Sequence, residues 1–110
     1  MERGEVHWYE FQPSDKRRPI LVLTRTSAIR FLNEVTVAPI TTTIRGIPSE
    51  VTLGMEDGLP QACAVNLDHL QTVPKAKVGR LITSLSAEKL SKISTALCFA
   101  LGMDDLVKSD

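Results

Sequence analysis

Two short stretches of the chain place cationic or hydroxyl side chains at the ends of apolar segments. The first is Lys16-Arg17-Arg18-Pro19, which leads into the apolar segment 20–23, and the second is Pro39-Ile40, followed by threonines at 41–43. An arginine at the mouth of a buried strand is held in place, and its planar, permanently charged guanidinium suits two phosphate oxygens at once. Threonine hydroxyls could donate to the same anion. The pattern indicates a phosphate-binding site, while a basic loop that is merely solvated is the more common interpretation of such residues.

Signatures of other catalytic and metal sites are absent from the sequence. It has no glycine-rich phosphate loop and no G-x-S-x-G elbow. His7 and His69 lack the spacing of metal ligands, and Glu56-Asp57 are adjacent residues beside a turn that do not converge easily on one ion. Cys63 and Cys98 are too far apart for a zinc site, so we expect two buried thiols. The sequence therefore predicts no metal site and no cofactor.

Length and composition predict one ordinary globular domain spanning residues 1–110. The chain is 43% hydrophobic and 24% charged, and 13 Lys+Arg balance 13 Asp+Glu. A net charge of zero argues against a protein that coats nucleic acid through bulk charge, although basic residues concentrate in the first third of the chain. No apolar run approaches the ~18–20 residues of a membrane span, and the first residues lack the apolar core of a secretory signal. We therefore expect a cytoplasmic protein without a membrane segment.

Apolar patterning predicts five or six short strands. The first, at 5–11, is rich in aromatic residues, and Trp8, Tyr9 and Phe11 either pack internally or leave one face of the strand for a partner. A bulge or a bend is expected near Asp68-His69, because the alternating apolar pattern slips by one residue there. The other expected strands are 20–23, 35–41, a short strand through 51–53, 63–67 and 81–85.

Two helices are expected beside these strands. Residues 27–33 are long enough for about two helical turns. A longer helix begins after the N-cap Ser86 and ends before Gly102, with an apolar stripe of Leu90, Ile93, Leu97 and Leu101. One good C-terminal helix after several short strands predicts a mainly β protein of the α+β class, built as a strongly bent sheet or a partly open barrel.

Several of these stretches together resemble the MazF/PemK/Kid family of bacterial toxins. Each motif is weak by itself, but their order and spacing match the family, and the helix from Ser86 to Gly102 is in its place. The resemblance therefore covers nearly the whole chain. The stretches that carry it are Arg3-Gly4-Glu5-Val6-His7-Trp8, the segments 16–23 and 36–42, and the segment 63–73.

The resemblance implies a fold, an activity and partners. The fold is an SH3-like barrel of the kind shared by MazF, Kid and the gyrase poison CcdB, working as a homodimer. The activity is that of a type II toxin-antitoxin toxin: a metal-independent endoribonuclease that cuts single-stranded RNA at short sequences and arrests growth. The substrate is messenger RNA, with transfer or ribosomal RNA as alternatives, and an antitoxin with a disordered tail holds the enzyme inactive.

The resemblance also implies residue roles. The catalytic pair is the arginine directly before the proline of the second strand and the threonine after the later Pro-Ile, which are Arg18 and Thr41 in this sequence. The resemblance extends RNA contacts to Arg25, Asp68 and His69. The basic stretch before Arg18 adds Lys16 and Arg17 to the expected RNA-binding residues.

The sequence departs from familiar members in two places. Its first loop, Gln12 to Arg17, is short, and His7-Trp8-Tyr9 replaces the more usual aromatic pair. Neither departure touches the catalytic pair. The alternative function is that of a non-catalytic barrel of the same fold, a protein-binding poison like CcdB. The presence of both Arg18 and Thr41 favours the endoribonuclease, because a pure binder has no need of that pair.

Overall fold

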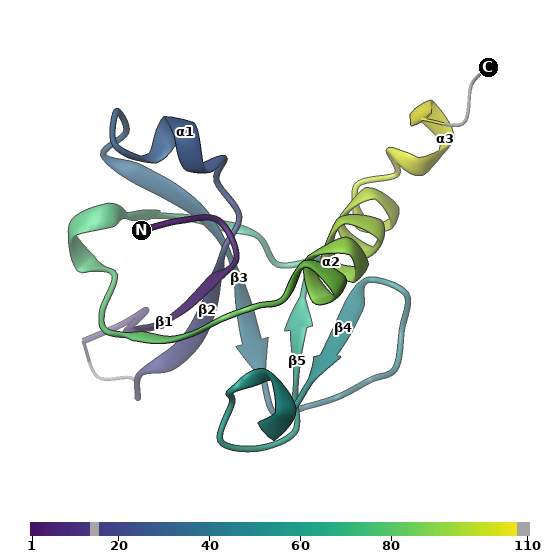
Figure 1. Cartoon of the computed structure of the whole chain (residues 1–110), viewed down its shortest axis with the longest axis horizontal. Coiled ribbons are helices and arrows are strands. Elements are labelled where there is room, and N and C mark those ends of the chain that lie inside the picture. The colour runs from purple at the N-terminus through teal and green to yellow at the C-terminus, as the bar shows by residue number, and fades with distance from the viewer. Residues whose placement is uncertain (14–15, 108–110) are drawn as a thin grey trace.

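The described residues form one seven-stranded antiparallel sheet, strongly bent, with one long helix packed across it (Figure 1). The computed structural model describes residues 1–13 and 16–107. The strands are β1 (Glu5–Tyr9), β2 (Arg18–Val22), β3 (Glu34–Thr41), β4 (Glu50–Leu53), β5 (Cys63–Asn66), β6 (Gln71–Pro74) and β7 (Leu81–Ser84). Their order is β4-β5-β3-β2-β1-β7, and β6 also pairs with β3. The prediction of a mainly β protein with a C-terminal helix is confirmed.

The helices are short except for one. They are α1 (Thr26–Ile29), α2 (Ala87–Ala100) and α3 (Asp104–Val107), and two 3₁₀ turns, η1 (Met55–Asp57) and η2 (Lys75–Lys77), lie between strands. None of the helices in the described part of the chain is long and apolar enough to cross a membrane.

Strand β3 connects the two halves of the sheet. One of its edges pairs with β2, while its other edge pairs with β6 over Glu34–Val37 and with β5 at Ile40 and Thr41. The chain therefore turns at residues 67–69 between β5 and β6, which confirms the bend expected near Asp68-His69. Pro39 lies between the two pairings, where no strand on that edge needs its missing N–H.

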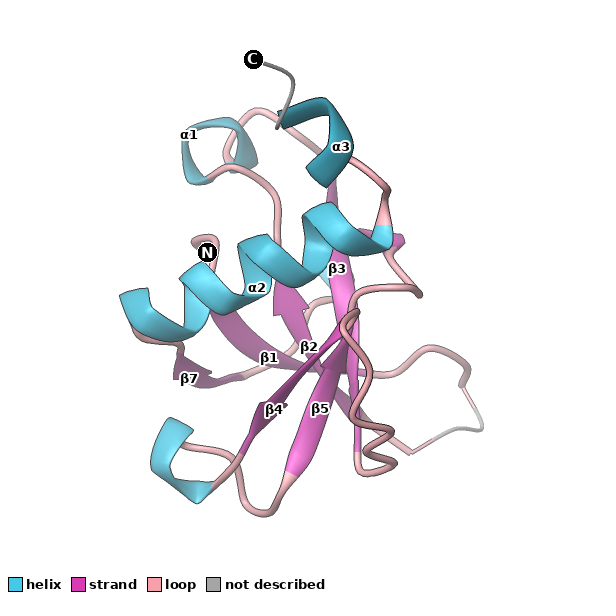
Figure 2. Cartoon of the chain, turned by 90° about the vertical axis from the view of Figure 1, so that its right-hand side faces the viewer, coloured by secondary structure: helices cyan, strands magenta, loops and turns pink. Residues whose placement is uncertain are grey.

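The core lies on both faces of the bent sheet. Leu21 of β2 packs into one apolar cluster, and its neighbours Ile20 and Val22 pack into the other. All three side chains are fully buried, as expected for the continuous apolar run. The first cluster is closed by Ile93 and Ala96 of α2, which crosses the sheet in Figure 2.

Helix α2 begins and ends as predicted. The Ser86 side chain accepts a hydrogen bond from the Lys89 backbone N–H at 3.2 Å, and Gly102 beyond the helix takes a φ of 70°. The predicted apolar stripe is correct for Leu90, Ile93 and Leu97 and wrong for Leu101, which is 54% exposed. The last turn of α2 and α3 extend away from the strands, so that residue has no sheet to cover (Figure 1).

Two expected features differ in extent. Helix α1 is a single turn rather than about two turns over 27–33, because only Ile29 of α1 reaches the core while Phe31 beyond it is 75% exposed. The first strand ends at Tyr9, and Phe11 lies beyond it, in edge-to-face contact with the Tyr9 ring at 4.8 Å. Both rings pack against the second core cluster, so they do not form an apolar face for a partner.

The lone histidine of β1 is a structural residue. His7 is 8% exposed; its Nδ1 lies 2.9 Å from the Gly79 carbonyl oxygen and its Nε2 lies 2.7 Å from Glu5 Oε1. These bonds tie β1 to the chain that enters β7. Burial is the largest single influence on the Glu5 carboxyl, and it raises the pKa. The hydrogen bonds with His7 and the Glu2 backbone and the nearby positive charges lower it, and together they outweigh burial. The pKa of Glu5 is therefore below its ordinary value.

We predict that Glu5→Gln lowers the free energy of unfolding at pH 7 by about 1 kcal/mol, the typical net value of one hydrogen bond. Because the pKa of Glu5 is lower in the folded protein than in the unfolded chain, the carboxylate stabilises the fold at neutral pH. That contribution is lost as the pH falls through the folded-state pKa. Urea unfolding of wild type and variant across a pH series measures the difference, and the exposed Glu10→Gln serves as control. A difference that does not shrink in acid contradicts the prediction.

Candidate active site

Arg18 and Thr41 lie at the adjoining ends of two neighbouring strands. Arg18 begins β2 and Thr41 ends β3. The antiparallel register pairs Leu21 with Ala38 and Ile20 with Pro39, and continuing it by two residues sets Arg18 opposite Thr41. The pairing of β2 with β3 is therefore what brings the two predicted catalytic residues together.

The pair lines one pocket of about 430 Å³. The basic stretch contributes Lys16 and Arg17 to the same pocket, and the Arg17 guanidinium carbon lies 5.6 Å from the centre of the Trp8 ring. No Asp or Glu of the described chain lines this pocket, so its charge is positive and it suits an anion. The opposite side is formed by Leu59, Pro60, Gln61 and Cys63.

The Thr41 hydroxyl is oriented by its own loop. Its Oγ1 accepts a hydrogen bond from the Thr43 backbone N–H at 3.1 Å. A hydroxyl whose oxygen is already an acceptor keeps its own proton for donation to another group. Thr41 is therefore prepared to donate to an anion held beside Arg18.

Thr41 also borders a second, smaller pocket of about 230 Å³, which His69 and Asn66 line as well. The Asp68 backbone N–H donates to Asn66 Oδ1 at 2.9 Å, and Asn66 Nδ2 lies 3.2 Å from His69 Nδ1. The Asp68 carboxylate is held from the other side by the hydroxyl of the buried Ser49 at 2.5 Å. The turn between β5 and β6 thus brings His69 to the smaller pocket that Thr41 borders, whereas Asp68 lines neither this pocket nor the one that holds Arg18.

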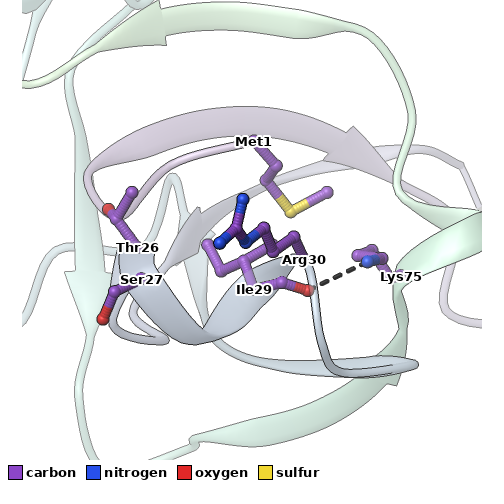
Figure 3. A pocket seen from close by; sticks show the side chains of 6 residues that line it. All are labelled: Met1, Thr26, Ser27, Ile29, Arg30 and Lys75. Carbon is purple, nitrogen blue, oxygen red and sulfur yellow. Dashed lines mark hydrogen bonds between the residues drawn. The ribbon is translucent and has the colours of Figure 1, made fainter.

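Arg25 is the predicted RNA-binding residue that the structure places apart. It lies beyond the other end of β2, directly before α1, and lines neither of the two pockets that Thr41 borders. A pocket of about 560 Å³ lies beside α1, where Lys75 Nζ donates to the Ile29 carbonyl at 2.9 Å (Figure 3). None of the predicted site residues lines it.

Cys63 is the thiol closest to the predicted catalytic pair, and the pocket suppresses its ionisation. Burial, followed by the negative charges of Asp57 and Glu56, raises the pKa of the thiol. A raised pKa keeps the thiol in its neutral form, which is a weaker nucleophile than the thiolate. The expectation of two buried thiols is confirmed for Cys63 and wrong for Cys98, which is partly exposed. Among the residues that the structure describes, no group of three or more His, Cys, Asp or Glu could hold a metal ion.

Sequence reasoning missed several residues of the site. Asn66 and Ser49 are buried polar residues whose hydrogen bonds fix the turn at 67–69, and no motif marks either one. Gln61 was missed too, although its place after the turn signal Asp57-Gly58 put it in a loop. The only available signal for Asn66 was a polar residue at the end of an otherwise apolar strand.

The bent antiparallel sheet with a C-terminal helix matches the architecture of MazF-like toxins. A family model described as "PemK-like, MazF-like toxin of type II toxin-antitoxin system" matches residues 2–101, and the chain belongs to this family. It is 42% identical over 93 residues to Endoribonuclease MazF3 of Mycobacterium tuberculosis. The aligned residues cover 84% of this chain and 90% of that protein. It is 44% identical over 96 residues to Probable endoribonuclease MazF5 of the same organism, covering 86% and 87%.

Solved structures agree with this assignment. The Mycobacterium tuberculosis toxin MazF-mt6 superposes with a TM-score of 0.82 at 39% identity, over 89% of this chain and 96% of that one. An endoribonuclease in complex with its cognate antitoxin from a mycobacterial species gives a TM-score of 0.84 at 30% identity, over 94% and 96%. The predicted family and its barrel fold are confirmed, and the chain is an endoribonuclease toxin of the MazF type.

Proposed function

We propose that this toxin cuts single-stranded RNA at short sequences without a metal ion, and that the cuts arrest growth. The substrate in this proposal is a cytoplasmic RNA, either messenger RNA or, as alternatives, transfer or ribosomal RNA. The observation that carries the proposal is the position of Arg18 and Thr41, which lie at the ends of two neighbouring strands and line one pocket with two further cations. Single strands are required because their bases and backbone can be splayed apart.

The proposed reaction needs only groups of the RNA and the protein. The ribose 2′-hydroxyl attacks the neighbouring phosphorus, so that the P–O2′ bond forms and the P–O5′ bond breaks. The 2′-hydroxyl loses its proton, the departing 5′-oxygen gains one, and the products are a cyclic phosphate and a 5′-hydroxyl.

Arg18 and Thr41 act on the charge that develops in this step. The phosphorane oxygens gain negative charge, which fixed donors must stabilise. The Arg18 guanidinium stabilises that charge and can deliver a proton to the 5′-oxygen. It does not act as the base, because a guanidinium is not deprotonated in proteins. The Thr41 hydroxyl, oriented by the Thr43 N–H, donates to the same oxygens.

The remaining predicted residues hold the strand on either side of the cut. Lys16 and Arg17 bind flanking phosphates, and the half-buried Trp8 gives a base a surface on which to stack. Asp68 and His69 meet the neighbouring nucleotide on the far side of Thr41. Contact with Arg25 requires an RNA path that continues past the other end of β2.

The active form in this proposal is a symmetric homodimer controlled by an antitoxin. Phe99 and Leu101 are about half exposed at the end of α2 and offer apolar surface for a second copy, with 49% and 54% exposure. The related mycobacterial endoribonuclease was solved with its cognate antitoxin. In the proposed dimer, both subunits form one groove that contains the cationic pocket, and RNA binds along it. An acidic, disordered tail of the antitoxin that becomes ordered over Arg18 and Arg25 would compete with RNA for this groove.

We predict cleavage of single-stranded RNA in excess EDTA. The pair of fixed donors replaces the charge stabilisation that a metal would otherwise provide. Purified protein is incubated with single-stranded and duplex RNA of the same sequence, and the termini of the products are analysed. Duplex RNA should resist. Activity that vanishes in EDTA and returns with magnesium contradicts the mechanism, and no cleavage under any condition favours the non-catalytic, CcdB-like alternative.

We predict that Arg18→Ala and Thr41→Ala each reduce the cleavage rate by about 10²–10³, the usual effect of removing one transition-state donor. Arg17→Ala and Thr43→Ala are the matched controls and should be milder, because their side chains do not occupy the facing positions. Cleavage rates and growth arrest are measured for all four variants, with circular dichroism as the folding control. If Arg17→Ala proves the most damaging, the register argument fails.

We predict a dimer whose groove binds either RNA or antitoxin. Light scattering at micromolar concentration should give twice the chain mass, and Leu101→Lys should shift the protein toward monomer. A peptide of the antitoxin tail at saturation should displace labelled RNA. A clean monomer that still cuts RNA contradicts the dimer, and simultaneous binding of RNA and peptide contradicts the shared groove.

A further inference from the structure

The turn between β5 and β6 contains a chain of hydrogen bonds with a defined direction. It starts at the Asp68 backbone N–H, which can only donate and lies 2.9 Å from Asn66 Oδ1. This contact fixes which end of the Asn66 amide is the oxygen. The other end, Nδ2, is then a donor, and it lies 3.2 Å from His69 Nδ1.

The direction of the chain decides where His69 carries its proton. An imidazole nitrogen that accepts a hydrogen bond has no proton of its own, so the neutral ring must carry its proton on Nε2. We propose that Asn66 is a positioning residue that holds His69 as the Nε2–H tautomer. His69 then serves the RNA as a hydrogen-bond donor beside Thr41 rather than as a base. The functional part of this proposal rests on the proposed RNA cleavage.

The surroundings suit this role. Asn66 is 6% exposed and pairs with Glu50 in the β4–β5 ladder, so its side chain starts from a fixed backbone. The Ser49 hydroxyl holds the Asp68 carboxylate, which anchors the same turn from the other side. His69 itself is exposed, and its Nε2 has no hydrogen-bond partner among the described residues. The free N–H is therefore available to a ligand in the pocket that His69 shares with Thr41.

An N–H donor in this position recognises an acceptor atom of the RNA. Base edges and phosphate oxygens both provide such acceptors. A base contact depends on the RNA sequence, whereas a phosphate contact does not. Loss of a base contact changes the relative cleavage of substrates that differ at one base. Loss of a phosphate contact lowers cleavage of all substrates by the same factor.

The tautomer is read directly by long-range ¹H–¹⁵N correlation on the full-length, ¹⁵N-labelled protein at about pH 8, above the ordinary titration range of histidine. Spectra of His69→Gln and of wild type separate the His69 signals from those of His7. We expect the Nε2–H tautomer in wild type. Asn66→Asp keeps an acceptor for the Asp68 N–H but cannot donate, so His69 Nδ1 should become protonated. Asn66→Ala, which introduces no buried charge, should give a mixture of tautomers.

The kinetic arm uses the same variants with single-stranded RNA. Asn66→Asp should reduce cleavage about tenfold in an otherwise wild-type chain, and it should have little further effect when combined with His69→Ala. His69→Gln, which retains an N–H donor, should keep more activity than His69→Ala. Thermal melting of each variant checks that the fold is intact.

The outcomes separate this proposal from the proposed function. An Nδ1–H tautomer in wild type, or spectra that do not change in either Asn66 variant, overturns the assignment. Full additivity of Asn66→Asp and His69→Ala overturns the positioning role. A wild-type protein that shows the expected tautomer but cuts no RNA overturns the proposed function and leaves the tautomer assignment intact.

Discussion

The antiparallel register between β2 and β3 is the constraint on which the rest of the structure depends. It is fixed by burial, because Leu21 enters one apolar cluster while Ile20 and Val22 enter the other. A shift of one residue would send each of these side chains to the wrong face. The same register determines which residue stands opposite Arg18. The geometry of the candidate site is therefore a consequence of how the core is packed, and the site needs no separate scaffold.

The second pocket arises from the change of partner along β3. Because β6 pairs with the first half of β3 and β5 with its end, the chain must turn between them, and that turn brings His69 to the pocket that Thr41 borders. Pro39 is compatible with the arrangement because it occupies the interval between the two pairings. One feature of sheet topology thus places Thr41 and the turn that carries His69 side by side.

Elements with strong local signals could be predicted from the sequence. The apolar run of β2, the strand β3 and the capped helix α2 all occur where their patterns indicated. Strand β6 was missed because only Val73 of its residues is buried, and α1 was overestimated because exposed apolar residues follow it. The Arg18–Thr41 pair came from a family resemblance, and the pairing of strands explains it. The hydrogen bonds of Asn66 depend on side-chain geometry in a turn, which no residue pattern encodes.

The pairing of β1 with β7 has a consequence for the timing of synthesis. Glu5 pairs with Ser84 and Val6 with Thr83, so the first strand finds one of its two neighbours only near the end of the chain. Contacts of such long sequence separation slow folding. The apolar face closed by Ile93 and Ala96 likewise stays open until α2 has left the ribosome. A nascent chain therefore lacks the edge strand β7 and the helix that closes one side of the core, so this fold is completed only after the last part of α2 has been made.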